Sequence, residues 1–266
     1  MHLKRWLTGI IVVPILIYII GFGPRWLFYL LVLAASLAGL MEYYAVATSG
    51  LPKSVRTASY CMTVLIFVVL YMRQALLAPV VIVLWAFIPM TLFMLSHHSP
   101  NPQWTGDIGK SVLGPIYVVL PLAMLVMIDL RPNGTLWIFF LLVVIFAGDT
   151  GAFYFGRLFG KHKLYEKISP GKTWEGAVGG LVCSVIAALW FLHILRLHKV
   201  DLSMVLLVLA LSIAGQIGDL AESMLKRNHG VKDSGKILPG HGGMLDRIDG
   251  LLFSIPLLHL FLTFSI

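Results

Sequence analysis

The residues best suited to chemistry form a stripe on one predicted helix near the C-terminal end of the chain. Asp219, Glu222, Ser223, Lys226 and Arg227 follow the spacing i, i+3, i+4, i+7, i+8, which places them on one helical face. Glu222 and Lys226 can pair at i, i+4 without any further role. Asp219 has no such partner on its own helix, and a metal ion or a basic residue from the next loop would satisfy it. We therefore expect the stripe to be functional.

The segment after the stripe combines glycines with charges of both signs. It reads KDSGKILPGHGGMLDRID from Lys232 to Asp249. Glycine lets the backbone approach a ligand closely, and Lys and Arg neutralise phosphate. Asp246 and Asp249 could cap the last helix, but one carboxylate would be enough for that. Two carboxylates beside a glycine cluster favour a hard cation such as Mg²⁺.

A second basic segment, residues 156–173, ends in the tripeptide Gly-Lys-Thr. A P-loop would need a glycine where Glu166 stands, and no strand is predicted before the tripeptide, so we reject that motif. Composition alone fits a polybasic loop beside anionic lipid. The alternative is a second wall of a phosphate site, before a helix whose N-terminal amides attract anions. Its polar side chains would be Ser169, Lys172 and Thr173.

Two further acids fall inside apolar runs, where an ionised side chain costs roughly 2.5–3.5 kcal/mol on insertion scales. Glu42 lies a turn or more from the end of its run, could extend its carboxylate to the interface, and is expected to be structural. Asp149, which has Gly148 and Gly151 beside it, could form an ion pair within the bundle or contribute to the site. Both alternatives for Asp149 stay open.

The elements that must position these residues are membrane helices. Of the 266 residues, 59% are hydrophobic and 12% are charged, and the mean hydropathy is +0.90. A soluble domain carries about 25% charged residues, so the composition excludes soluble, secreted and disordered proteins. Both cysteines, Cys61 and Cys183, lie in apolar runs and predict neither a disulfide framework nor a zinc site.

We predict an all-α polytopic integral membrane protein with about nine spans, since a span needs about 20 apolar residues. About five spans fall in an N-terminal region, residues 1–130. About four fall in a catalytic region, residues 131–266, with long cytoplasmic loops at 156–173 and 226–248. The expected spans are 6–21, 24–47, 57–73, 77–96, 109–128, 134–155, 174–195, 202–225 and 249–265.

The distribution of Lys and Arg predicts the orientation of the chain. With these spans, fifteen of the 20 Lys and Arg residues lie on the side of the N-terminus. That side is therefore expected to be cytoplasmic, and nine spans place the C-terminus on the outer side. The two long cytoplasmic loops hold ten of the fifteen cations. Cations, carboxylates and glycines at this boundary indicate metal-assisted handling of a polyphosphate, with a lipid and a nucleotide as substrates.

Residues 223–249 resemble the signature of the phosphatidate cytidylyltransferases (CDP-diacylglycerol synthases). The matching pattern is S-x-L-K-R-x₄-K-D-x-G-x₂-L-P-x-H-G-G-M-x-D-R-I-D. Upstream, the segments G-D-T-G-A-F, F-G-K and I-S-P-x-K-T-x-E-G between residues 148 and 176 also resemble that family. The firm resemblance covers about residues 147–250, whereas the N-terminal spans match only in hydropathy and number.

The resemblance implies transfer of CMP from CTP to phosphatidic acid, giving CDP-diacylglycerol and pyrophosphate, with one or two Mg²⁺ ions. A phosphomonoester loses its second proton near pH ~6, so no strong general base is needed. The resemblance further implies a homodimer. The number of spans predicts a bacterial inner membrane, the Lys and Arg distribution places the site on the cytoplasmic side, and no nucleic-acid partner is expected.

The resemblance and the charge pattern together assign three sets of site residues. The metal ligands are Asp219, Asp246 and Asp249. The catalytic residues are Asp219, Ser223, Lys226, Arg227 and Asp246. The substrate-binding residues are Asp149, Ser169, Lys172, Thr173, Lys232, His241, Gly242, Gly243 and Arg247.

Other functions are compatible with parts of this pattern. A CTP-dependent polyprenol or phytol kinase, or a cytidylyltransferase for another lipid phosphate, uses similar chemistry at the same boundary. An organic-anion transporter would use intramembrane acids, but it predicts inverted repeats and mid-membrane polar groups. Here the polar groups gather at one face and no repeat is visible, which disfavours transport.

Overall fold

The computed structural model of the chain describes residues 13–48, 50–96, 103–235 and 242–264. These residues form two compact units. The first unit comprises Met1–Val126 and Asp233–Leu245, and the second comprises Met127–Lys232 and Asp246–Ile266. The segment before α10 thus belongs to the first unit, although the helices on either side of it belong to the second.

Eight helical segments in the described residues are long and apolar enough to cross a membrane, which confirms the polytopic all-α prediction. Their bounds agree with eight expected spans to within a few residues at most ends. The remaining expected span, 6–21, begins outside the described residues, and its described part, residues 13–21, is helical. The eight segments are Arg25–Ala47, Lys53–Tyr71, Ala75–Ser96, Gln103–Asp129, Gly134–Phe159, Trp174–Leu195, Leu202–Asn228 and Leu245–Phe264.

The first unit is built on α2, whose buried tyrosines bind the neighbouring helices. The Tyr44 hydroxyl group lies 2.9 Å from Ser59 Oγ on α3 and donates to the Ser111 carbonyl on α5 at 2.9 Å. The adjacent Tyr43 donates to the Lys110 carbonyl at 3.2 Å. The elements of this unit are α2 (Arg25–Ala47), α3 (Lys53–Tyr71), the short 3₁₀ helix η1 (Ala75–Leu77), α4 (Ala78–Ser96), α5 (Gln103–Gly114), the π-helical turn η2 (Pro115–Val119) and the start of α6 (Leu120–Asp129).

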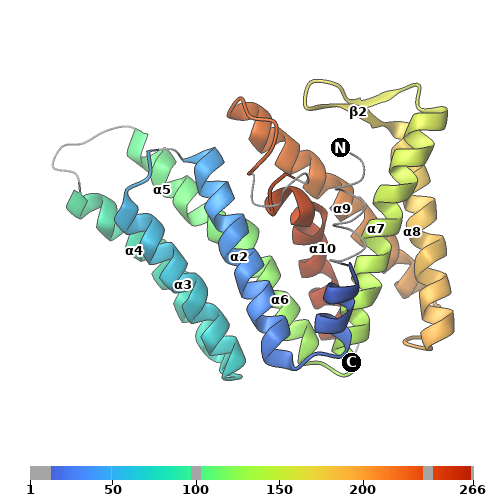
Figure 1. Cartoon of the computed structure of the whole chain (residues 1–266), viewed down its shortest axis with the longest axis horizontal. Helices are drawn as coiled ribbons and strands as arrows, with labels where there is room; N and C mark the ends of the chain where they lie inside the picture. The colour runs from blue at the N-terminus through green and yellow to red at the C-terminus, as the bar shows by residue number, and fades with distance from the viewer. Residues whose placement is uncertain (1–12, 49, 97–102, 236–241, 265–266) are drawn as a thin grey trace. The chain divides into compact units, whose positions relative to one another are not determined.

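The second unit contains the expected stripe, the basic segment 156–173 and the two ends of the segment 226–248. Its main elements are α7 (Gly134–Phe159), β1 (Lys163–Tyr165), β2 (Ser169–Thr173), α8 (Trp174–Leu195), α9 (Leu202–Asn228) and α10 (Leu245–Phe264). Within this unit the hairpin lies at one end of the helices, beside the C-terminal end of α9 (Figure 1). The charged ends of α9 and the hairpin therefore meet, as the sequence predicts for the long basic segments.

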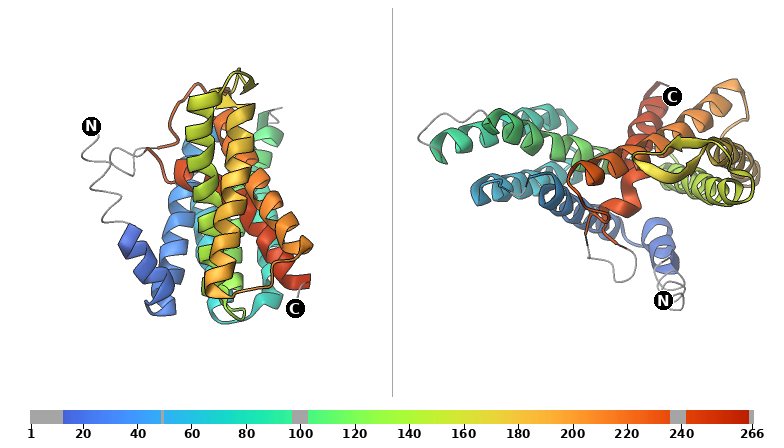
Figure 2. Two further views of the ribbon diagram at one scale, coloured as in Figure 1. Left: turned by 90° about the vertical axis from the view of Figure 1, so that its right-hand side faces the viewer. Right: turned by 90° about the horizontal axis from the view of Figure 1, so that it is seen from above.

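Small residues let α7 and α8 pack closely along their length, side by side in the left view of Figure 2. A Cβ atom at Gly180 on α8 would lie 2.8 Å from the Gly148 carbonyl oxygen and 3.1 Å from Ala152 Cβ. Membrane helices commonly approach through such small residues, because close backbone packing replaces the hydrophobic driving force that lipid does not provide.

Gly180→Ala should therefore destabilise the protein by about 1–3 kcal/mol, because the backbone of α7 would have to move. Thermal unfolding of the purified protein in detergent measures this effect. Gly109→Ala on α5 is the matched control, since nothing lies within 4 Å of a Cβ there and alanine favours the helix. Equal unfolding temperatures for the two variants would contradict the close packing of α7 and α8.

The segment 156–173 contains a β-hairpin, which the sequence analysis did not predict. β1 and β2 pair antiparallel, with Lys163 opposite Thr173 and Tyr165 opposite Ser169. A strand, β1, thus precedes the Gly-Lys-Thr tripeptide, contrary to expectation, but the rejection of a P-loop still rests on Glu166, which stands where that motif needs a glycine. Thr173 ends β2 and caps α8, since its buried hydroxyl accepts a hydrogen bond from the Gly176 N–H at 3.1 Å.

Candidate functional site

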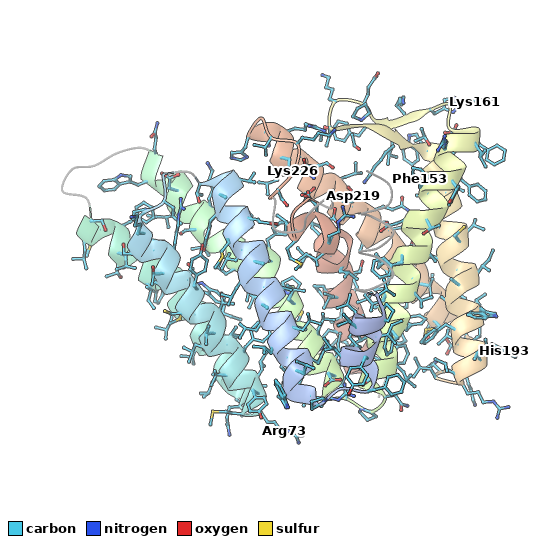
Figure 3. All side chains as sticks on the ribbon, viewed as in Figure 1. Arg73, Phe153, Lys161, His193, Asp219 and Lys226 are labelled. Atoms are coloured by element: carbon cyan, nitrogen blue, oxygen red, sulfur yellow. The ribbon has the colours of Figure 1, made fainter. Side chains whose placement is uncertain are left out.

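Three aspartates from three helices of the second unit form an acidic cluster. Asp149 on α7, Asp219 on α9 and Asp249 on α10 interact electrostatically with one another. Lys172 from β2 joins them, with its Nζ atom 2.6 Å from Asp219 Oδ2. We call these four residues the acidic cluster. Figure 3 labels Asp219 on α9, toward the end that carries the hairpin.

The acidic cluster has more negative than positive charge. Its three carboxylates face a single ammonium group, which leaves two formal negative charges unbalanced when all four groups are ionised. The site is also partly open, since the side chains of Asp219 and Lys172 are 42% and 25% exposed. An accessible group of oxygen ligands with excess negative charge can attract a hard cation.

A second group of charges, the Lys226 cluster, lies closer to the end of α9 and is more deeply buried. Lys226 Nζ lies 2.5 Å from Glu222 Oε2 and 2.7 Å from Asp246 Oδ1 on α10. The side chains of Glu222, Asp246 and Lys226 are 1%, 11% and 14% exposed. This cluster confirms the expected i, i+4 pair and shows that the same lysine also holds the start of α10.

The structure distributes the predicted metal ligands between these two clusters. Asp219 and Asp249 belong to the acidic cluster, whereas Asp246 pairs with Lys226. Asp149, which we had placed with the substrate-binding residues, joins Asp219 and Asp249. Among the described residues, no three or more His, Cys, Asp or Glu side chains converge as a ready-made metal site. The three assigned ligands therefore stay a prediction.

The partner of Asp219 comes from a different loop than expected. The sequence indicated a metal ion or a base from the loop after α9, and the structure provides Lys172 from the hairpin before α8. Ser223 is a weak neighbour, with its Oγ atom 3.5 Å from Asp219 Oδ1. The spacing on α9 predicted that Ser223 and Asp219 share one face, but nothing in the local sequence pointed to the ion pair with Lys172.

The catalytic candidate Arg227 and the other predicted substrate-binding residues lie mainly at the surface of this end. Arg227, Lys232 and Arg247 are exposed, and Arg227 Nε lies 3.4 Å from the Ile168 carbonyl oxygen of the hairpin. Ser169 is half-buried, and the cap on α8 already explains Thr173 without a substrate contact. Gly242 adopts a positive φ of 80°, and Gly243 is buried. His241 lies outside the described residues.

Glu175 in the first turn of α8 holds the hairpin in place, a role that the sequence analysis did not assign. Its carboxylate accepts hydrogen bonds from the backbone N–H of Lys161 at 3.1 Å and of His162 at 3.2 Å. His162 Nδ1 lies 2.6 Å from Glu175 Oε1. An acid at the first turn of a helix was the available signal, because such acids often bind free amides nearby. Glu175 thus fixes the hairpin that carries Lys172.

Glu175→Ala should loosen the hairpin and lower the activity of the site by about tenfold, because one lost anchor displaces Lys172 without removing it. Glu166→Ala, on the same hairpin but exposed, is the control. Limited proteolysis at Lys163 and Lys167 would report the loosening directly. Equal cleavage rates in the two variants would contradict this role of Glu175.

Comparisons with known proteins identify the family of the chain. A model of the cytidylyltransferase family matches residues 3–265. The phosphatidate cytidylyltransferase of Staphylococcus haemolyticus (strain JCSC1435) is 50% identical over 132 residues, which are 50% of this chain and 51% of that protein. The protein of the same name from Staphylococcus aureus (strain COL) is 47% identical over 137 residues, 52% of this chain and 53% of that protein.

The aligned part is limited in each relative. The chain spans about half the length of the curated relatives it matches. The family match, in contrast, extends over nearly the whole sequence. The chain therefore belongs to the cytidylyltransferase family.

Proposed function

We propose that the chain is a phosphatidate cytidylyltransferase of phospholipid biosynthesis. It would transfer CMP from CTP to phosphatidic acid and release pyrophosphate, with CDP-diacylglycerol as the lipid product. One observation supports this most. The acidic cluster, which includes Lys172, and the Lys226 cluster lie at the same end of a unit of membrane helices. The names of the relatives support the choice of phosphatidate as the acceptor.

The three aspartates of the acidic cluster offer the carboxylate oxygens that Mg²⁺ prefers, and they carry more negative charge than Lys172 balances, although the described side chains do not converge as a ready-made metal site. Asp219 and Asp249 would hold the ion, with Asp149 beside them. Asp246 remains a predicted ligand for the same or a second ion, and binding there would compete with its pairing to Lys226. Bound Mg²⁺ would neutralise triphosphate charge and orient the α-phosphate.

The reaction requires two anions to meet, and the cations of this end reduce their repulsion. A phosphate oxygen of phosphatidate forms a bond to the α-phosphorus of CTP. The bond from that phosphorus to the bridging oxygen of the β-phosphate breaks, and pyrophosphate leaves with the electron pair. Lys172 would hold a phosphate oxygen of either substrate. The residues available for the triphosphate or the pyrophosphate are Lys226, Arg227, Lys232 and Arg247.

We further propose that this end of the protein faces the cytoplasm of a bacterial cell, in its inner membrane. The support is the excess of Lys and Arg on one side of the expected membrane spans. That side is the side of the N-terminus, and it holds both long basic segments. An N-terminus in the cytoplasm and a C-terminus on the outer side follow from the same count. The homodimer remains a proposal that rests on the family resemblance.

An assay of purified protein with CTP, phosphatidic acid and Mg²⁺ tests the proposed reaction. We expect CDP-diacylglycerol and pyrophosphate to form in equal amounts, with no product when phosphatidate is left out. Release of CDP with a polyprenol or phytol would instead indicate a lipid kinase. Uptake of an organic anion into proteoliposomes without any phosphoryl product would indicate a transporter.

A further inference from the structure

A carboxylate of the first unit, far from the stripe in sequence, binds the segment that precedes α10. Glu42 on α2 is 4% exposed. Its Oε2 atom accepts hydrogen bonds from Ser234 Oγ at 3.1 Å and from the Leu245 N–H at 2.8 Å. Its Oε1 atom accepts one from the Met244 N–H at 3.0 Å. Glu42 is therefore buried and enclosed by polar donors, in agreement with the structural role expected from the sequence.

The backbone around this carboxylate has no room for larger residues. A Cβ atom at Gly235 would overlap the Glu42 carboxylate, and a Cβ atom at Gly243 would overlap both that carboxylate and Ser234 Oγ. The sequence analysis interpreted Gly243 as a residue that lets the backbone approach a substrate. In the structure, Gly243 lets the backbone approach an acid of the same chain, and its assignment to substrate binding stays a prediction.

The hydrogen bond from Leu245 to Glu42 lies at the start of α10, where the backbone N–H groups need an acceptor from outside the helix. Leu245 is the first residue of α10, and the first amides of a helix have no acceptor within the helix. A carboxylate there satisfies these amides and complements the helix dipole. Burial of a carboxylate is costly unless it is fully hydrogen-bonded, and the three donors from Ser234, Met244 and the first residue of α10 meet that requirement here.

We propose that Glu42 is a positioning residue, which fixes residues 234–235 and 243–245 and thereby sets where α10 begins. Asp246 follows Leu245 directly, and Asp249 lies within the next turn of α10. Glu42 would act on both aspartates through the backbone of residues 243–245. The consequence for catalysis rests on the proposed function, whereas the contact itself does not.

Hydrogen–deuterium exchange of the full-length purified protein tests this proposal without any substrate. Glu42→Gln removes one of the two acceptor oxygens and turns an N–H group toward existing donors. Amides of the peptide that contains Met244 and Leu245 should then exchange faster by on the order of tenfold, the effect of losing about one hydrogen bond. Unchanged exchange in that peptide would overturn the proposal.

Tyr43→Phe is the matched control, because it removes a buried hydrogen bond from the next residue of the same helix. That bond goes to Lys110, so the peptide with Met244 and Leu245 should keep its wild-type exchange.

In the cytidylyltransferase assay, Glu42→Gln should lower kcat by about tenfold with little change in the KM for CTP, since Asp246 and Asp249 are displaced and not removed. Tyr43→Phe should retain wild-type kcat, and an equal loss of kcat in both variants would point to general destabilisation and contradict a positioning role.

A compensating pair keeps the test decisive if Glu42→Gln does not fold. Gly235→Ala places a methyl group against the Glu42 carboxylate, and Glu42→Asp withdraws that carboxylate by one methylene. We expect Gly235→Ala to lower thermal stability and the double variant to recover part of the loss. No recovery would contradict the contact. A wild-type protein without cytidylyltransferase activity would overturn the proposed function but leave the exchange and stability results as valid tests of Glu42.

Discussion

Asp219→Asn is expected to lower Mg²⁺-dependent CMP transfer by about 10²–10³-fold, a typical effect of removing one group that stabilises transition-state charge. Asp219 interacts with both other carboxylates of the acidic cluster and pairs with Lys172. Asparagine keeps the shape of the side chain but removes the charge, so metal affinity should fall while the protein still inserts and folds.

Asp201→Asn on the same helix provides the control for this substitution. Asp201 caps the opposite end of α9, where its carboxylate accepts a hydrogen bond from the Met204 N–H at 2.9 Å. Asparagine is an equally good cap, so this variant should retain wild-type turnover and stability. A turnover close to wild type in Asp219→Asn would end the assignment of Asp219 as a metal ligand.

Lys226→Met should have the largest effect on stability. The substitution leaves Glu222 and Asp246 buried without their shared cation, and breaking a buried ion pair in this way costs about 3–5 kcal/mol. Chemical or thermal unfolding in detergent would measure the loss. Activity should fall as well, because Lys226 is one of the cations that we assign to phosphate.

Two companion variants separate charge from packing in the Lys226 cluster. Arg227→Met removes the adjacent but exposed cation and should change stability little. Glu222→Gln introduced into Lys226→Met removes one of the two unpaired carboxylates and should recover part of the lost stability. If Lys226→Met were as stable as Arg227→Met, the Lys226 cluster would not be the buried ion-pair group described above.

The helices and the polar stripe could be predicted from the sequence because both are local patterns. Apolar runs of the right length fix where a helix crosses a membrane, and eight expected spans correspond to helices of the structure. The pair between Glu222 and Lys226 follows from the geometry of one helix and is present. Interactions within four residues of each other were therefore accessible to sequence reasoning.

The contacts that assemble the site were not accessible, because they join residues that are distant in sequence. Glu42 and Ser234 are 192 residues apart, and no local pattern indicates that they meet. The partner of Asp219 was expected after α9, whereas Lys172 precedes α8. The β-hairpin was missed because its strands are short and polar, without the alternation of apolar residues that marks a half-buried strand.

Binding of Mn²⁺, followed by electron paramagnetic resonance of the purified protein, tests the central claim most directly. The claim is that carboxylates of the acidic cluster hold a divalent ion at the end of the protein where the cations gather. We predict saturable binding to the wild-type protein and its loss in the double variant Asp219→Asn/Asp249→Asn, with binding retained in Asp201→Asn. Equal Mn²⁺ binding by the wild-type and the double variant would contradict the account.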